Sequence, residues 1–172
     1  VVADSKYKTA KDLLAAIKSN PPGTLTASGT GQGGIWHVGL LGWLMSEGVE
    51  PDRVKFVPMG GAAPALKEML SGGLSFVTNS NAESASLISA GRVKALAHMG
   101  PARLPEFPDV PTLKEATGSD WTIACWRLIV GPKGLSKEAL DVLTPAVKKA
   151  YESKEYKEFM KARGFGMVFR GS

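Results

Sequence analysis

Hydrophobic and polar positions first fall into a helical pattern near the start of the chain. Leu13, Leu14 and Ile17 recur at helical spacing after Thr9, a residue type that favours the N-cap position. The two prolines and the glycine of residues 20–23 end that pattern. The sequence therefore predicts a helix that starts after Thr9 and stops at Asn20.

Beyond this helix, further predicted helices alternate with short apolar runs typical of strands as far as residue 98. Such alternation favours an α/β fold with a mostly parallel sheet flanked by helices. Val1 and Val2 resemble the tail of a preceding strand. The predicted strands cover residues 24–28, 54–57, 74–78 and 93–98, and the predicted helices cover residues 35–47, 63–70 and 83–90.

Beyond residue 100 the alternation breaks down. Residues 101–111 are rich in proline and predict a long loop, and residues 121–130 are β-prone and predict one bent strand or two strands. Ser136 is placed to cap a final helical region, in which we expect Pro145 to kink or restart the helix. The apolar positions of that region are Leu140, Leu143, Val147 and Tyr151.

Composition and charge narrow the classes of protein that remain. Hydrophobic residues make up 44% of the chain and charged residues 22%, which are ordinary globular values. Cys125 is the only cysteine, so an internal disulfide is excluded, and its apolar neighbours predict a buried core position. The net charge of +5 suits an anionic ligand or simple solubility. The lysines after residue 147 alternate with glutamates at helical spacing, which favours a solvated helix face over nucleic-acid binding.

Residues 29–34 form the sequence feature that most strongly suggests chemistry. They match G-x-G-x-x-G between a predicted strand and a predicted helix, where backbone N–H groups and the helix dipole attract an anion. A dinucleotide site also needs an acidic residue at the end of the second strand. That strand ends in Pro58 and Met59, whereas Glu50 and Asp52 precede it. The loop is therefore better explained as a nest for a smaller anion.

Two further loops follow strands of the same predicted sheet. Residues 60–62 and 79–81 each open a helix, and the carboxyl ends of parallel strands share one edge of a sheet. Three helix N-termini converging on one anion would suit a carboxylate. His37, one turn into the first of these helices, could reach back to that anion, although packing inside the protein is an alternative role.

Enzyme hypotheses find little support in the sequence. No G-x-S-x-G elbow surrounds Ser28, and no His, Asp or Glu cluster has the spacing of a metal site. We therefore predict a binding protein with no catalytic residues, no cofactor and no metal.

Several stretches, in order, cover nearly the whole chain and resemble one family. They are residues 8–13, 25–37, 57–66, 89–97, 108–116 and 126–135. Together they resemble the substrate-binding proteins of tripartite tricarboxylate transporters, the Bug-type receptors. The resemblance implies a type II periplasmic-binding fold of two lobes, a small carboxylate ligand, membrane permease subunits as partners, and a periplasmic or extracytoplasmic location.

The resemblance also implies a division of the chain and a set of ligand contacts. Residues 1–22 would be the crossing strand and first helix, residues 23–120 the second, ligand-binding lobe, and residues 121–172 the return strand and C-terminal helices of an incomplete first lobe. We expect most of the first lobe to be missing, and exposed return segments could then join copies of the chain into a homo-oligomer. The implied ligand contacts are Ser28, Thr30, Gly31, Gln32, Gly33, Gly34, His37, Gly61, Ala62 and Asn79.

The sequence departs from the family pattern at several positions near these contacts. The family usually has tyrosine and lysine where Met59 and Gly60 stand, and commonly has aspartate at Ser75 and Asn79. Because these departures change the polar groups near the predicted contacts, we expect a ligand preference that differs from that of other family members. A second hypothesis is the effector-binding domain of a transcription regulator, which shares the fold and would carry a DNA-binding module.

Overall fold

The structure is a computed structural model, and it describes residues 1–126, 128–163, 165, 167 and 169. The chain forms two compact units, Val1–Cys125 and Trp126–Ser172.

The first helix forms as its pattern predicts. Helix α1 spans Ala10–Ser19, and Thr9 caps it through a capping box with Asp12. Leu13, Leu14 and Ile17 are buried on one face of the helix, as expected for an amphipathic stripe facing a core.

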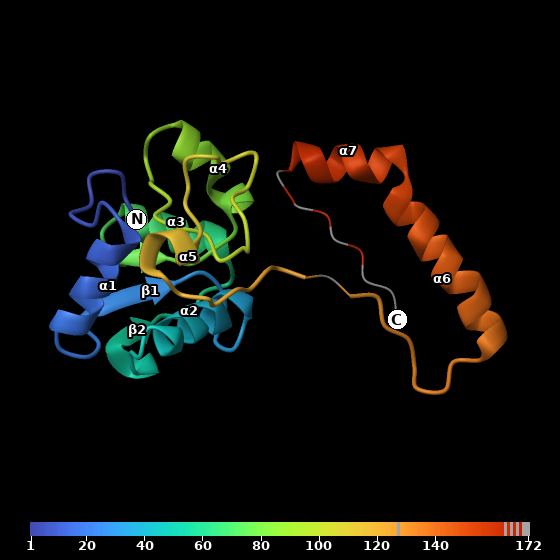
Figure 1. The fold of residues 1–172 in the computed structure, drawn as a ribbon, viewed down its shortest axis with the longest axis horizontal. Helices are drawn as coiled ribbons and strands as arrows, with labels where there is room; N and C mark the ends of the chain where they lie inside the picture. Colours follow the sequence, from blue (N-terminus) through green and yellow to red (C-terminus); the bar gives the residue numbers. More distant parts are fainter. Residues whose placement is uncertain (127, 164, 166, 168, 170–172) are drawn as a thin grey trace. The chain divides into compact units, whose positions relative to one another are not determined.

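A three-stranded parallel sheet lies at the centre of the first unit (Figure 1). Strand β1 (Leu25–Ser28) lies between β2 (Val54–Phe56) and β3 (Phe76–Val77). Leu25 pairs with Val54, and Ser28 pairs with Val77. Because all three strands run the same way, their carboxyl ends meet at one edge, and this confirms the predicted α/β fold with a parallel sheet.

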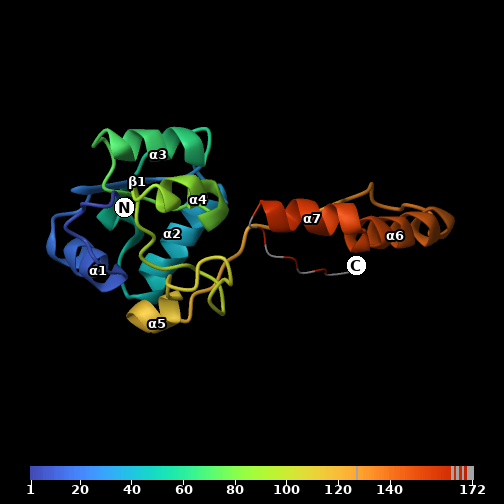
Figure 2. The same cartoon turned by 90° about the horizontal axis from the view of Figure 1, so that it is seen from above.

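Helices cover both faces of this sheet, and none of the four residues of β1 is exposed. They are α2 (Ile35–Ser46), α3 (Ala62–Leu70) and α4 (Asn81–Ser89), and a short 3-10 turn at Pro51–Arg53 precedes β2. In Figure 2, α3 lies on one side of β1, and α1 and α2 lie on the other. Leu25 and Ala27 belong to the core shared with α1 and α2, whereas α3 forms a second core cluster with Leu74 and Val93.

The strand predicted at residues 93–98 is not formed as a continuous strand. Val93 makes an isolated antiparallel bridge with Val2, and His98 makes an isolated parallel bridge with Thr112. Two short partners at opposite ends replace the single neighbour that a continuous ladder requires. The sequence reading also missed α5 (Leu113–Thr117), a helix of little more than one turn whose N-terminus Thr112 caps.

The β-structure predicted for residues 121–130 is absent from the part of that segment that the structure describes; Arg127 lies outside it. Leu128, Ile129 and Val130 are instead exposed. High β-propensity produces a strand only where a neighbouring backbone supplies ladder hydrogen bonds. The prediction for Cys125 was also wrong, because its side chain is exposed and not in the core.

The second unit contains two amphipathic helices. Helix α6 spans Lys137–Glu152 behind the predicted cap Ser136, and α7 spans Lys154–Ala162. Pro145 does not restart α6, which runs through it; the chain restarts at Ser153, the N-cap of α7. Neither helix buries a residue, and Tyr151 contacts the rings of Tyr156 and Phe169. None of the helices that the structure describes is long and apolar enough to cross a membrane.

Candidate functional site

Three loops meet at the carboxyl edge of the parallel sheet, and hydrogen bonds join them. The amide of Met59 donates to the carbonyl of Thr30 at 3.1 Å, and the amide of Thr78 donates to the carbonyl of Ser28 at 2.9 Å. The loops after β2 and β3 are thus both tied to the loop after β1. We call the surface formed by residues 28–34, 58–61 and 78–80 the glycine edge.

The glycines of the first loop allow close backbone approaches. A side chain at Gly29 would collide with the carbonyl of Thr78, and one at Gly34 would collide with Thr30. Gly33 has a φ of +75°, in the left-handed region that favours glycine. The amide of Gly34 donates to the carbonyl of Gly31 at 3.0 Å, which closes the turn directly before α2. The predicted tight glycine turn is therefore present.

Two helices start at the glycine edge without a side-chain cap. Gly34 precedes α2 and Gly61 precedes α3, and neither position offers a side-chain acceptor to the first amides of its helix. Those amides have no acceptor inside a helix and form the positive end of the helix dipole. An anion at this edge can accept hydrogen bonds from them.

Helix α4 begins at the same edge, and side chains cap its N-terminus. Ser80 and Glu83 form a capping box, in which the Glu83 carboxylate accepts from the Ser80 amide at 2.9 Å. The capping box satisfies the amides of Ser80 and Glu83, so α4 offers fewer free amides at its start than α2 and α3. The convergence of three helix N-termini on one anion stays a prediction.

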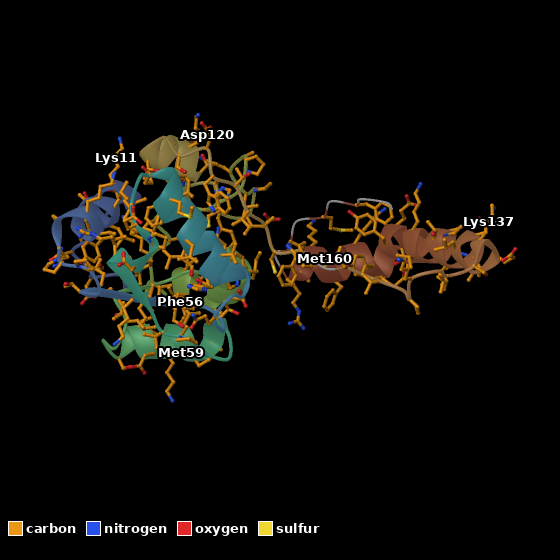
Figure 3. The ribbon with its side chains drawn as sticks, turned by 90° about the horizontal axis from the view of Figure 1, so that it is seen from below. Lys11, Phe56, Met59, Asp120, Lys137 and Met160 are labelled. Atoms are coloured by element: carbon orange, nitrogen blue, oxygen red, sulfur yellow. The ribbon has the colours of Figure 1, made fainter. Side chains whose placement is uncertain are left out.

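His37 is bound to the glycine loop and does not lie free beside it. Its Nδ1 atom accepts a hydrogen bond from the Gly33 amide at 2.9 Å, and its ring packs on Phe56 with centroids 4.2 Å apart. Burial lowers the pKa of His37 below its ordinary value. The neutral ring therefore carries its proton on Nε2, which is available as a donor. Phe56 and Met59, both labelled in Figure 3, belong to the segment that leads into α3.

Ser28 is fully buried at the end of β1, with 0% of its surface exposed. Its hydroxyl has no hydrogen-bond partner within the described residues. A buried polar atom without a partner is costly, and such atoms are uncommon in native proteins. A water or ligand atom that reached Ser28 would remove that cost.

The remaining predicted contacts differ in what they can offer. Gly31, Gln32 and Gly33 are exposed, whereas Ala62 is buried in the second core cluster and contributes only its backbone. The side-chain nitrogen Nδ2 of Asn79 donates to the Ser80 carbonyl at 2.9 Å and lies 2.5 Å from the Ser84 hydroxyl. None of the ten predicted contact residues is a lysine, arginine, aspartate or glutamate, so the donors that they supply are polar groups without a full charge.

Thr78 is a residue of this edge that the sequence reading missed. Its hydroxyl donates to the carbonyl of Trp36 at 3.0 Å, in the first turn of α2. It thereby joins the end of β3 to the start of the helix behind the glycine loop. A β-branched hydroxyl residue at a strand end is the only signal that the sequence carries for it.

Other features of the described chain do not point to a competing site. No group of three or more His, Cys, Asp or Glu residues within the described ranges is placed to hold a metal ion. Two hollows of the first unit are lined by other residues, one around Gly100 and Trp121 and one around Ala3 and Arg92.

Comparison with known proteins gives a family match over the full length. The sequence profile of the tripartite tricarboxylate transporter family receptor matches residues 1–172. A TctC solute-binding protein from Polaromonas is 31% identical, with a TM-score of 0.77 over 98% of this chain and 56% of its own. The chain spans about half the length of the curated relatives it matches.

Two solved structures with less sequence identity share the fold. Rpa4515 from R. palustris, solved with adipate, is 23% identical, with a TM-score of 0.79 over 95% of this chain and 54% of its own. MatC from Rhodopseudomonas palustris, solved with malate, is 22% identical, with a TM-score of 0.77 over 95% of this chain and 54% of its own.

Proposed function

Because this chain belongs to the family of tripartite tricarboxylate transporter receptors, we propose that its glycine edge binds a small carboxylate. The observation that carries this proposal is the pair of uncapped helix N-termini, α2 and α3, at one edge of one sheet. Both offer backbone donors, which suit carboxylate oxygens without a counter-charge. The ligands of the two R. palustris proteins are carboxylates and support the same class.

The role of the whole protein follows from the family as part of the same proposal. The protein would act outside the cytoplasm as a receptor, hand its ligand to membrane permease subunits, and catalyse no reaction. Residues 23–120 would form the ligand-binding lobe and residues 121–172 would belong to a different lobe. The chain divides into compact units between Cys125 and Trp126, five residues after the proposed boundary.

Thermal unfolding of the chain with a panel of mono- and dicarboxylates, including adipate and malate, tests the ligand class. Ligand at about one hundred times its Kd should stabilise the chain by about 2.7 kcal/mol, because only the folded state binds. An unchanged Tm across the panel, including millimolar concentrations, would contradict the proposal.

A pair of glycine variants ties the effect to this edge. Gly33→Val and Gly118→Val both place a branched side chain at a left-handed φ, of +75° and +89° respectively. Both should lower the Tm, but only Gly33→Val should abolish the response to ligand, because Gly118 ends α5 and lies outside the glycine edge. Equal ligand responses in the two variants would place the site elsewhere.

A further inference from the structure

We propose that Ser84 holds the Asn79 carboxamide in one orientation, and that this orientation selects carboxylates carrying a hydroxyl or amino group. The inference rests on the proposed carboxylate-binding function of the glycine edge. Ser84 lies on α4 and is not among the contacts that the sequence implied. It would act as a positioning residue for ligand specificity.

The orientation of Asn79 follows from its partners. The carboxamide atom that lies 2.9 Å from the Ser80 carbonyl must be the nitrogen, because a carbonyl oxygen can only accept a hydrogen bond. The same nitrogen lies 2.5 Å from the Ser84 hydroxyl. Both hydrogens of the amide therefore have partners inside the protein, and neither is left for a ligand.

The partners themselves are held firmly. Ser84 is buried, with 6% of its surface exposed, and it lies on the first turn of α4. The capping box of Ser80 and Glu83 fixes that turn, with the Ser80 hydroxyl 2.7 Å from the Glu83 carboxylate. Rotation of the Asn79 carboxamide would break its hydrogen bonds to both serines, so the packed helix opposes it.

The carboxamide oxygen is the end of the half-buried Asn79 side chain that has no hydrogen bond. Within the described residues no hydrogen bond reaches Oδ1, and this atom is not one of the buried polar atoms that lack a partner. Asn79 directly follows Thr78, whose amide is bonded to Ser28. The loop after β3, one of the three loops of the glycine edge, therefore carries an acceptor without a hydrogen bond within the described residues.

An acceptor at this place discriminates between ligands. An ionised carboxylate carries only acceptor oxygens, so it pairs with helix amides but not with Oδ1. A hydroxyl or ammonium group on the same ligand can donate to Oδ1. A ligand with a carboxylate and a hydroxyl or ammonium group can pair with both the helix amides and Oδ1. An unsubstituted dicarboxylate leaves Oδ1 without a hydrogen bond.

Succinate, malate and aspartate provide a matched set of probes, since they are four-carbon dicarboxylates that differ by a hydroxyl or an amino group. Calorimetric titration of the wild-type chain should give roughly tenfold tighter binding of malate or aspartate than of succinate, the effect of about one hydrogen bond. The two substituted probes separate a preference for hydroxyl from one for amine.

Ser84→Ala tests the positioning role, and Ser86→Ala is its control on the exposed side of the same helix. In Ser84→Ala the carboxamide can turn its nitrogen toward a carboxylate, so the preference over succinate should fall to about twofold or less. Ser86→Ala should keep the wild-type ratio. Without ligand, the side-chain amide resonances of Asn79 should shift in Ser84→Ala and stay in place in Ser86→Ala.

The outcomes separate this inference from the function on which it rests. Equal affinity for succinate, malate and aspartate in the wild type would overturn the selection by Asn79 and leave carboxylate binding intact. Unchanged Asn79 resonances in Ser84→Ala would overturn the role of Ser84. Binding of none of the three, with no response to other carboxylates, would overturn the proposed function and this inference with it.

Discussion

Single hydrogen bonds determine how the glycine edge is held together. Thr78 bonds to Ser28 through its amide and to Trp36 through its hydroxyl, and His37 accepts from Gly33 through Nδ1. The bonds of Thr78 join residues that lie far apart along the chain. The bond between Gly33 and His37 depends on the protonation state of His37. Each therefore leads to a prediction about one atom.

The hydroxyl of Thr78 should stabilise the start of α2. Thr78→Val keeps the shape of the side chain but removes its bond to the Trp36 carbonyl, so the free energy of unfolding should fall by about 1 kcal/mol. Thr78→Ser keeps the hydroxyl and should recover most of that loss. Amide hydrogen exchange should be faster at Val38 in Thr78→Val but unchanged at Val49 beyond the far end of the helix. Equal exchange at Val38 in both variants would contradict the role assigned to the hydroxyl.

The protonation of His37 should make stability depend on pH. Burial lowers the pKa of His37 in the folded chain below 6.5, so the unfolded chain binds its proton first as the pH falls. The stabilising contribution is complete above about pH 6.5 and is lost as the pH falls through the folded pKa. Protonation of Nδ1 also removes the acceptor for the Gly33 amide.

Urea unfolding at about pH 8 and about pH 5.5 measures this loss. The decrease should be smaller in His37→Gln than in the wild type. His98 and the Val1 amino group should supply the remaining decrease in both proteins, because burial also lowers the pKa of each. An identical pH dependence in the two proteins would show that His37 is not held neutral.

At the scale of elements, side-chain caps distinguish the helices that begin with a capping residue from the two helices that we propose bind the ligand. Thr9, Ser80, Thr112, Ser136 and Ser153 cap their helices with side chains, whereas α2 and α3 start behind glycines. Each capping side chain accepts a hydrogen bond from the third amide of its helix, whereas α2 and α3 have no such side-chain acceptor. Capping residues could be recognised in the sequence, but whether a helix start faces a shared edge depends on the sheet.

Helix α5 is short enough that its cap should be decisive. Thr112 accepts from the Glu115 amide at 3.1 Å, and the Glu115 carboxylate accepts in return from the Thr112 amide at 2.8 Å. Thr112→Ala should therefore lower the free energy of unfolding by about 1 kcal/mol in chemical denaturation. Thr112→Ser retains the acceptor and should lose only a small part of this. A full-sized loss in the serine variant would instead implicate the methyl group.

At the scale of the whole molecule, the chain separates into two units of different character. The first has a buried core on both faces of its sheet, and the second consists of helices that bury none of their residues. Leu128, Ile129 and Val130, at the start of the second unit, are between 69% and 81% exposed. An exposed segment without regular structure is the preferred place for proteolysis.

Limited chymotrypsin digestion of the native chain should therefore cut first after Trp126 or Leu128, as read by mass spectrometry. The larger product should retain the far-ultraviolet dichroism expected of the first unit. Early cleavage within α3 or α4 would show instead that the first unit is the less stable of the two.

The sequence by itself determined the elements whose signals are local. The caps Thr9 and Ser136, the apolar stripe of α1, the order of strands and helices to residue 90, and the tight turn of residues 29–34 all follow from side chains within a few positions of each other. The family resemblance added the fold and a set of contact residues, and those contacts stay a prediction.

Only the tertiary structure decided which of these elements act together. Residues 93–98 and 121–130 have strand propensity but no continuous neighbour in the described chain, so they form isolated bridges or no strand. The capping box of α4, the attachment of His37 to Gly33, and the orientation that Ser84 imposes on Asn79 depend on atoms placed by folding. Propensity is a property of a residue and its close neighbours, whereas pairing and hydrogen-bond partners depend on what the rest of the chain brings alongside.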